Sequence, residues 1–364
     1  MKKLFTSVVS LVTALTMLTA CGGSESSGDK SETETTTTTT TAQTSQTDET
    51  TTTTAAPADS SSPDESSQTE PEQTSSITPM MWEVTGKNGA KITMAGAMHA
   101  LKEDAYPLPK KITDAFEAAD VLAVECDVTN ITDNFALQLE QLKNMYYEGD
   151  DTLENHLDPE IYKGISDFAT ECGSSLALYN RCKPWVVVSL LEQLAMSQTE
   201  LKAYLGFDSN LTEMAKDAGK EIYELESAKM QTELLVSLPD NICEVMVADY
   251  ARSRDEVVQE YEDTYTAWCE GNYDFFADGL DTEKVRQTAQ EQGIEFTDED
   301  AALLEEYNKL MVYDRNVGMR DKILQLLDGD KDIFLTVGAA HFAGDKGLVA
   351  LLQAEGYTVT RVEY

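Results

Sequence analysis

The order of apolar and polar residues predicts that the folded part of the chain opens with a β-hairpin. Residues 82–84 and 91–95 are rich in apolar and β-branched side chains, and the turn-forming sequence Gly-Lys-Asn-Gly lies between them at 86–89. Two short runs of this kind, joined by a glycine-containing turn, are typical of paired antiparallel strands. We therefore expect the first two strands of a sheet here.

The next segment predicts a crossover to a parallel strand. Pro107 and Pro109 precede a helix in which the apolar residues at 112, 115, 116 and 119 share one face. Residues 121–124 then form a short and wholly apolar run, as strands that are buried on both faces do. The second hairpin strand, the helix and this run together make a β-α-β unit.

The middle of the chain is predicted to be mostly helical, because apolar residues recur there at intervals of three and four. The segments with this spacing are 134–147, 159–171, 184–197, 211–218 and about 228–269, followed by two acidic stretches at 281–292 and 298–310. Within this region, residues 220–225 have the composition of a short strand.

The end of the chain repeats the pattern of the beginning. We expect a helix over about 312–327, a strand at 333–337, a helix from 344 or 345 to 355 and a final strand at 358–362. The resulting fold class is α/β, with internally duplicated β-α-β units that form a central mixed sheet and a large helical insert between them.

The N-terminus has the features of a targeting segment. Lys2 and Lys3 precede an apolar stretch that ends in Leu-Thr-Ala-Cys at 18–21, which resembles a bacterial lipobox with Cys21 as the lipidated residue. An ordinary secretory signal is the alternative, and both would take the protein out of the cytoplasm. We expect a lipoprotein signal peptide at 1–21 and an anchor in the outer face of the cytoplasmic membrane.

Composition separates a tether from the domain that follows it. Residues 22–77 are mostly Thr, Ser and acidic side chains, which bury too little apolar surface to fold, so we expect a disordered tether there and one domain at 78–364. Residues 1–77 hold 3 Lys and Arg and 11 Asp and Glu, a net of −8, which leaves −31 of the total −39 on the rest. Such a surface repels nucleic acid, which we exclude as a partner, and attracts cations.

Cysteine usage gives no zinc motif. Five of the 6 cysteines lie beyond Cys21, and none has Cys-x-x-Cys spacing. Cys172 and Cys182 flank a short Gly-Ser-Ser segment. Two alternatives remain for them, a disulfide in an oxidising envelope or two free thiols in the core.

Histidine placement gives the best indication of function. The chain has 3 His, and two of them, His99 and His341, each close a Gly-x-x-His pattern that follows a predicted strand. Glu125 and Glu226 follow two other predicted strands. The carboxyl ends of parallel strands meet at one edge of a sheet, where α/β proteins bind ligands. We expect convergence in one crevice; the alternative is a pair of core histidines with satisfied hydrogen bonds.

Together these segments resemble the TraB/GumN family, which includes the TIKI metalloproteases that cleave Wnt proteins. The resemblance spans residues 80–364. It is carried by Trp82-Glu83-Val84, Gly96 to His99, Pro107-Leu108-Pro109, Val124-Glu125, Leu205-Gly206-Phe207-Asp208, Leu225-Glu226-Ser227, Arg315-Asn316 and Gly338 to His341.

The resemblance implies a divalent-metal site. Similar members carry two Gly-x-x-His motifs and a glutamate proposed to bind the metal, which correspond here to His99, His341 and Glu125. Two imidazoles and one carboxylate leave coordination positions open for water and substrate. Manganese, cobalt, zinc and iron all suit such ligands, and the sequence does not choose among them.

Four further residues are candidates for supporting roles. The alternatives for Glu226 are a fourth metal ligand, a general base, or simply the cap of the following helix. Arg315 is expected to neutralise a developing oxyanion or to clamp a substrate carboxylate, with Asn316 orienting a neighbour. Asp208 is expected to hold Arg315, and the alternative is that these two form a purely structural ion pair.

The resulting hypothesis is an extracytoplasmic, metal-dependent hydrolase that cleaves a peptide or protein substrate by means of a metal-activated water. One alternative is a surface binding module that sequesters a peptide or signal molecule without turnover. Another is a hydrolase of a small ester or lactone, which would need a pocket closed to polypeptide. The sequence contains no Gly-x-Ser-x-Gly or His-Glu-x-x-His motif, so serine-hydrolase and zincin functions have no support.

Overall fold

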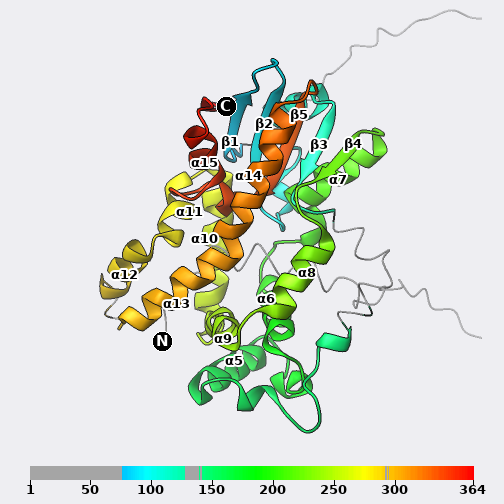
Figure 1. The fold of residues 1–364 in the computed structure, drawn as a ribbon. Coiled ribbons are helices and arrows are strands. Elements are labelled where there is room, and N and C mark those ends of the chain that lie inside the picture. The colour runs from blue at the N-terminus through cyan, green and yellow to red at the C-terminus, as the bar shows by residue number, and fades with distance from the viewer. Residues whose placement is uncertain (1–75, 128–138, 140–141, 292, 294) are drawn as a thin grey trace, which may run out of the picture. The chain divides into compact units, whose positions relative to one another are not determined.

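The computed structural model describes residues 76–127, 139, 142–291, 293 and 295–364. The expected signal peptide at 1–21, nearly all of the expected tether at 22–77 and most of the expected helix at 134–147 lie outside these residues. The centre of the described part is a six-stranded sheet in the order β4-β3-β5-β2-β1-β6 (Figure 1). Its strands are β1 Met81–Thr85, β2 Lys91–Ala97, β3 Val121–Val124, β4 Glu221–Glu224, β5 Ile333–Gly338 and β6 Val359–Arg361.

The sheet is mixed, as the sequence pattern predicted. Strands β1 and β2 form the expected antiparallel hairpin, with Met81 opposite Ala95, and β6 pairs with β1 in the antiparallel direction. Strands β2, β5, β3 and β4 run parallel to one another. Every residue of β3 and of β5 is buried, because helices cover both faces of a parallel sheet and favour uninterrupted apolar strands.

Two β-α-β units are present, and they interleave in the sheet. Helix α2, Lys110–Ala118, joins β2 to β3, and helix α15, Leu348–Ala354, joins β5 to β6. Strand β5 of the second unit inserts between β2 and β3 of the first. The carboxyl ends of strands from both units therefore meet at one edge of the sheet.

A long helical region precedes β5. Its helices are α5 Pro159–Glu171, α6 Pro184–Ser197, α7 Phe207–Asp217, α8 Ala228–Ser237, α9 Asp240–Ala248, α10 Arg254–Cys269, α11 Tyr273–Leu280, α12 Thr282–Glu291, α13 Asp298–Asn308 and α14 Asp314–Leu327. Strand β4 lies between α7 and α8 in the chain and extends the edge of the sheet. The bounds of α5 and α6 are the predicted ones.

The helical character expected over about 228–269 is confirmed, and the stretch divides into three helices, α8, α9 and α10. Pro239 stands at the break between α8 and α9, where its missing N–H and its ring disfavour a continuing helix. Ser253 then starts α10 through a reciprocal capping box with Glu256. Before α14, a π-helical turn, Lys309–Tyr313, replaces the expected helix start at 312.

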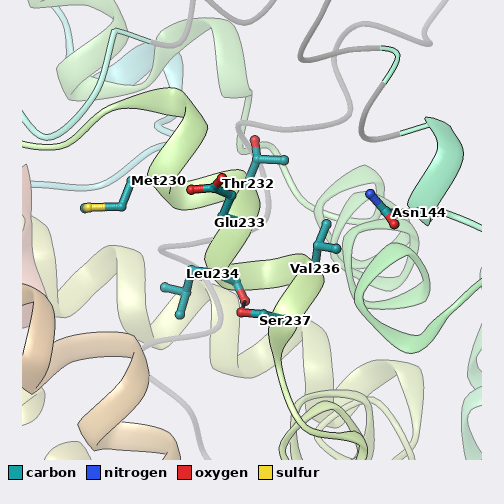
Figure 2. A pocket seen from close by; sticks show the side chains of 7 residues that line it. All are labelled: Asn144, Met230, Thr232, Glu233, Leu234, Val236 and Ser237. Atoms are coloured by element: carbon teal, nitrogen blue, oxygen red, sulfur yellow. Dashed lines mark hydrogen bonds between the residues drawn. The ribbon is translucent and has the colours of Figure 1, made fainter.

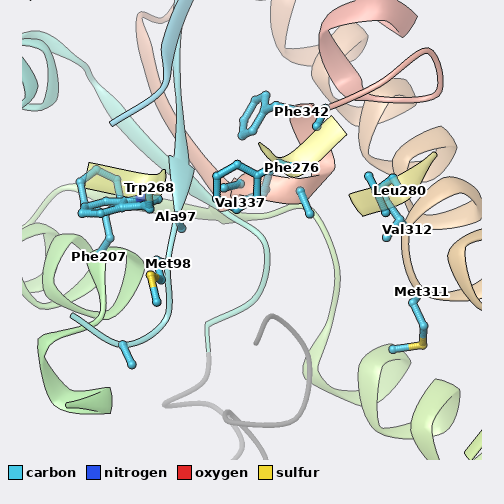
Figure 3. Packing of buried hydrophobic residues seen from close by; sticks show 14 of the residues in the cluster. Ala97, Met98, Phe207, Trp268, Phe276, Leu280, Met311, Val312, Val337 and Phe342 are labelled. Carbon is cyan, nitrogen blue, oxygen red and sulfur yellow. The ribbon is translucent and has the colours of Figure 1, made fainter. Parts of the chain in front are cut away.

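Packing against the end of β2 fixes the position of the first Gly-x-x-His segment. Phe207 meets Trp268 edge to face at 5.6 Å, and Figure 3 shows both rings beside Ala97. The indole Nε1 of Trp268 donates to the carbonyl oxygen of Gly96 at 2.8 Å. A Cβ on Gly96 would lie 3.1 Å from the Cα of Ala339, so glycine there lets the two Gly-x-x-His segments approach closely.

Cys172 and Cys182 are both free thiols, which contradicts the disulfide alternative. Within the described residues, no helix combines the length and the apolar character needed to cross a bilayer.

Candidate functional site

Four candidate residues follow the carboxyl ends of the four parallel strands. His99 lies beyond β2, Glu125 directly after β3, Glu226 beyond β4 and His341 beyond β5. Their side chains are buried, with relative exposures of 6%, 7%, 2% and 1% in that order. The shared strand direction thus brings residues from both ends of the domain to one buried edge.

Arg315, at the start of α14, links the two glutamates. Its Nε donates to Glu226 Oε1 at 3.0 Å, and its terminal nitrogen Nη2 donates to Glu226 Oε2 at 2.7 Å and to Glu125 Oε1. Its Nη1 donates to the carbonyl oxygen of Met311 at 3.0 Å, in the π-helical turn before α14. Charge-assisted hydrogen bonds of this kind hold the arginine in one orientation.

The structure contradicts one expectation and one alternative for these residues. Asp208 does not hold Arg315, because its carboxylate accepts a hydrogen bond from His99 while Arg315 is paired with Glu125 and Glu226. Glu226 does not cap the following helix either. The cap of α8 is Ser227, whose side chain accepts from the backbone N–H of Met230.

His341 is oriented by Asn316, the neighbour of Arg315 on α14. Asn316 Nδ2 donates to the carbonyl oxygen of Lys346 at 2.9 Å, so its Oδ1 faces His341 Nδ1 at 2.6 Å. An amide oxygen only accepts, and therefore His341 carries its proton on Nδ1 and a lone pair on Nε2. That Nε2 lies 3.8 Å from Glu125 Oε2 and has no hydrogen-bond partner among the described residues.

His99 is oriented by Asp208 on α7. Its Nδ1 lies 2.9 Å from Asp208 Oδ2, and its Nε2 has no hydrogen-bond partner in the described part of the chain. A Cβ on Gly206 would lie 2.4 Å from the carbonyl oxygen of His99. Glycine at 206 therefore lets the start of α7 reach the backbone of His99, which brings Asp208 within hydrogen-bond distance.

The two histidines differ in their protonation. Burial lowers the pKa of His99, but the charge and hydrogen bond of Asp208 outweigh burial and raise this pKa to about 9. Burial and the charge of Arg315 lower the pKa of His341 to about 3. Burial acts to raise the pKa of Glu125, but Arg315, the two histidines and the backbone N–H of Gly338 together outweigh it and hold that pKa at about 2. Near neutral pH, His99 is thus an imidazolium, His341 is neutral and Glu125 is ionised.

Sequence reasoning missed Gln231, the fourth residue of α8. Its Nε2 donates to Glu125 Oε1 at 3.0 Å and to Glu226 Oε2 at 2.9 Å, so it ties the two carboxylates together. Its position in the sequence was the available signal. Gln231 lies early in a helix that begins shortly after strand β4, and a polar side chain there can face the edge of the sheet at which the strands end.

His156 and Cys126 lie outside this arrangement. His156 stacks on Tyr147 at a centroid distance of 4.2 Å, and its Nε2 lies 2.8 Å from Asp151. Cys126 is buried against Ala228, and burial raises the pKa of its thiol. Neither residue offers a free ligand to the site.

The site's donor atoms suit a divalent cation. Among the described residues, no three His, Cys, Asp or Glu side chains are already placed to hold one metal ion together. The two buried Nε2 atoms are nevertheless without hydrogen-bond partners there, and Glu125 Oε2 faces one of them. Imidazole and carboxylate are typical ligands of divalent metals. The Nδ1 contacts to a carboxylate and an amide oxygen are of the kind that orient metal-binding histidines.

Comparison with known proteins supports a family assignment. The "Uncharacterized protein YbaP" of Escherichia coli strain K12 is 25% identical over 266 residues, which cover 71% of this chain and 87% of that protein. The protein of the same name from Shigella flexneri gives the same values. No solved structure matches the chain. The model of the TraB/PrgY/gumN family matches residues 80–361, which include all six strands and every candidate site residue, and the chain therefore belongs to this family.

Proposed function

We propose that the protein is an extracytoplasmic metal-dependent hydrolase that cleaves peptide bonds. The observation that supports this most directly is the pair of buried imidazole Nε2 atoms, on His99 and His341, that have no hydrogen-bond partner among the described residues. A buried polar atom without a partner is costly, and a metal ion is one partner that removes the cost.

In this proposal His99, His341 and Glu125 hold a manganese, cobalt, zinc or iron ion. Such an ion supplies activation of water and polarisation of the scissile carbonyl. Asp208 and Asn316 keep the Nδ1 proton of each ring in place, so that Nε2 stays available. His99 would have to give up its Nε2 proton in order to hold the ion, because a histidine ligand must be neutral.

Arg315 is proposed to stabilise negative charge that develops on the substrate. An arginine has five N–H groups, and the contacts to Glu125, Glu226 and Met311 use four of them. The remaining N–H, on Nη1, is the one that could serve a developing oxyanion. Glu226 and Gln231 are assigned to holding Arg315 and Glu125 in position.

The test uses the full chain and a matched set of histidine variants. Elemental analysis of the purified protein should find about one divalent ion per chain, and digestion of a random peptide library should stop when a chelator is added. His99→Ala and His341→Ala should each lose both the ion and the cleavage. His156→Ala removes the same side chain outside the site and should keep both. Full cleavage by either site variant would refute the proposal.

The rival proposal, a binding module that sequesters a peptide or signal molecule, has a different signature. It is the better description if the protein carries no stoichiometric ion and retains intact peptides from the same library.

We also propose that Cys21 is lipidated and anchors the protein at the outer face of the cytoplasmic membrane. The lipobox-like sequence at 18–21 supports this. Cells grown with a labelled fatty acid should label the wild-type chain and not Cys21→Ala. Equal labelling of both chains would contradict lipidation at this residue.

A further inference from the structure

A hollow of about 290 Å³ lies between α8 and α14, next to the candidate site. Buried Arg315 and Glu226 belong to its lining. Most of the remaining wall is apolar and flexible, with Leu225, Met230, Leu234, Leu310 and Met319. The unbranched side chains of its two methionines can adapt their shape to an apolar guest.

Three of the four charged side chains in this wall are paired with an opposite charge within the protein. Arg315 pairs with Glu226 and Asp314 with Lys309, while Lys322 Nζ donates to the backbone carbonyl oxygen of Glu224 at 3.4 Å and keeps its charge. Removal of apolar surface from water is therefore the main gain on binding of an apolar guest.

Gly318 is the second observation that points to a guest. It lies in the interior of α14 and lines the hollow, and a Cβ built on it would meet no other atom within 4 Å. Glycine is one of the least favourable residues inside a helix, and here no close neighbour requires it. The absence of a side chain at position 318 keeps the hollow open.

A second hollow, of about 450 Å³, adjoins the first along α8 (Figure 2). Met230 and Leu234 line both hollows, and in Figure 2 their side chains leave α8 on the same side. Two adjacent hollows suit an extended chain, which presents successive side chains, better than one small ester.

We propose that the hollow beside Gly318 receives an apolar side chain of a polypeptide substrate, and that it selects Phe, Leu or Met close to the cleaved bond. This inference rests on the proposed function, because Arg315 and Glu226 connect the hollow to Glu125.

The experiment replaces Gly318 with Phe, which fills the hollow from a helix position that accepts a side chain without a clash. Val317→Phe is the matched control, since Val317 is exposed on the same helix and does not line the hollow. Binding is measured by fluorescence anisotropy with the chelator-treated full chain, so that no turnover occurs. The probes are labelled hexapeptides that differ at one central residue, Phe, Leu, Met, Gly or Asp. Cleavage of the same peptides by the metal-loaded chain is a separate measurement.

The wild-type chain should bind the Phe, Leu and Met peptides at least tenfold more tightly than the Gly and Asp peptides. Gly318→Phe should abolish that preference with no loss of thermal stability, and Val317→Phe should keep it. Equal selectivity in wild type and Gly318→Phe, or no peptide binding at all, would overturn the inference, as would binding of decanoate in place of peptides. If the chain binds these peptides selectively but does not cleave them, the inference stands and the proposed hydrolase function is refuted. If it cleaves them without selectivity, the inference is refuted and the hydrolase function stands.

Discussion

The two Gly-x-x-His segments have the same sequence pattern and the same position after a parallel strand, yet their histidines differ in charge. A carboxylate on α7 holds His99 and raises its pKa to about 9. An amide on α14 holds His341, which lies near Arg315 and has a pKa of about 3. The duplicated motif thus places two equivalent rings, and the element that packs against each ring decides whether it carries a proton.

Among substitutions that test the difference between the two histidines, Arg315→Ala should have the largest effect. The change removes the cation that lowers the pKa of His341 and leaves Glu125 and Glu226 buried without it. Breaking a buried ion pair in this way should lower the free energy of unfolding by about 3–5 kcal/mol, as measured by urea denaturation of the full chain. Arg320→Ala, at a partly exposed ion pair on the same helix, should cost less than about 1 kcal/mol. Equal losses in the two variants would show that the buried network is not what stabilises the site.

The pH dependence of stability should show both histidines at once in the metal-free chain. His99 has a raised pKa, so its contribution is complete below pH 6.5 and is lost as the pH rises towards about 9. His341 has a lowered pKa, so its contribution is complete above pH 6.5 and is lost as the pH falls towards about 3. The alkaline loss should amount to roughly 3 kcal/mol, measured by urea denaturation across the pH range.

His99→Gln serves as the control for the alkaline branch. It should remove the loss between pH 6.5 and 9 and leave the acid branch in place. An unchanged alkaline branch in this variant would mean that another group causes it.

Asp208→Asn should make His99 resemble His341. Without the carboxylate charge, the pKa of His99 should fall well below about 9, which NMR titration of the ring protons can follow. Loss of a hydrogen bond to a charged group should cost about 1.5–3 kcal/mol, and metal affinity should fall by about 10–100-fold. Asp217→Asn, at an exposed position of the same helix, should change none of these. A His99 pKa that stays near 9 would contradict the assigned cause.

The reverse replacement, Asn316→Asp, tests the other ring through its pKa. The new carboxylate is fully buried, faces the Lys346 carbonyl oxygen in place of the lost N–H, and gains a counter-charge only when His341 takes up a proton, so the variant should lose stability as the pH rises. The diagnostic readout is the pKa of His341, which should rise from about 3 in the NMR titration. If this pKa does not move, the partner on α14 does not control the charge of the ring.

The fold could be predicted from the sequence wherever local pattern was sufficient. The hairpin, the apolar runs of β3 and β5, and the bounds of α5 and α6 follow from periodicity and turn residues. The division of 228–269 was missed because apolar spacing continues through Pro239, and only the backbone chemistry of proline ends the helix there. The π-helical turn before α14 has no comparable signature in the sequence.

The sequence predicted which residues make up the site, but it did not predict which of them contact one another. Strand ends marked His99, Glu125, Glu226 and His341, but contacts across long separations decide their partners. Arg315 lies 89 residues from Glu226 and 190 from Glu125 in the chain, and His99 lies 109 from Asp208. By charge alone, Arg315 could pair with Asp208 as well as with either glutamate. Only the packing of α7 and α14 determines which of these ion pairs forms.

The central position of β5 has a consequence for how the protein matures. This strand is synthesised late, yet it inserts between β2 and β3. The strands that precede His99 and Glu125 are therefore not joined in one sheet until β5 pairs with both. Pairing between such distant segments is slow to form. A chain released before residue 333 would lack both β5 and His341, so the candidate site could not be completed.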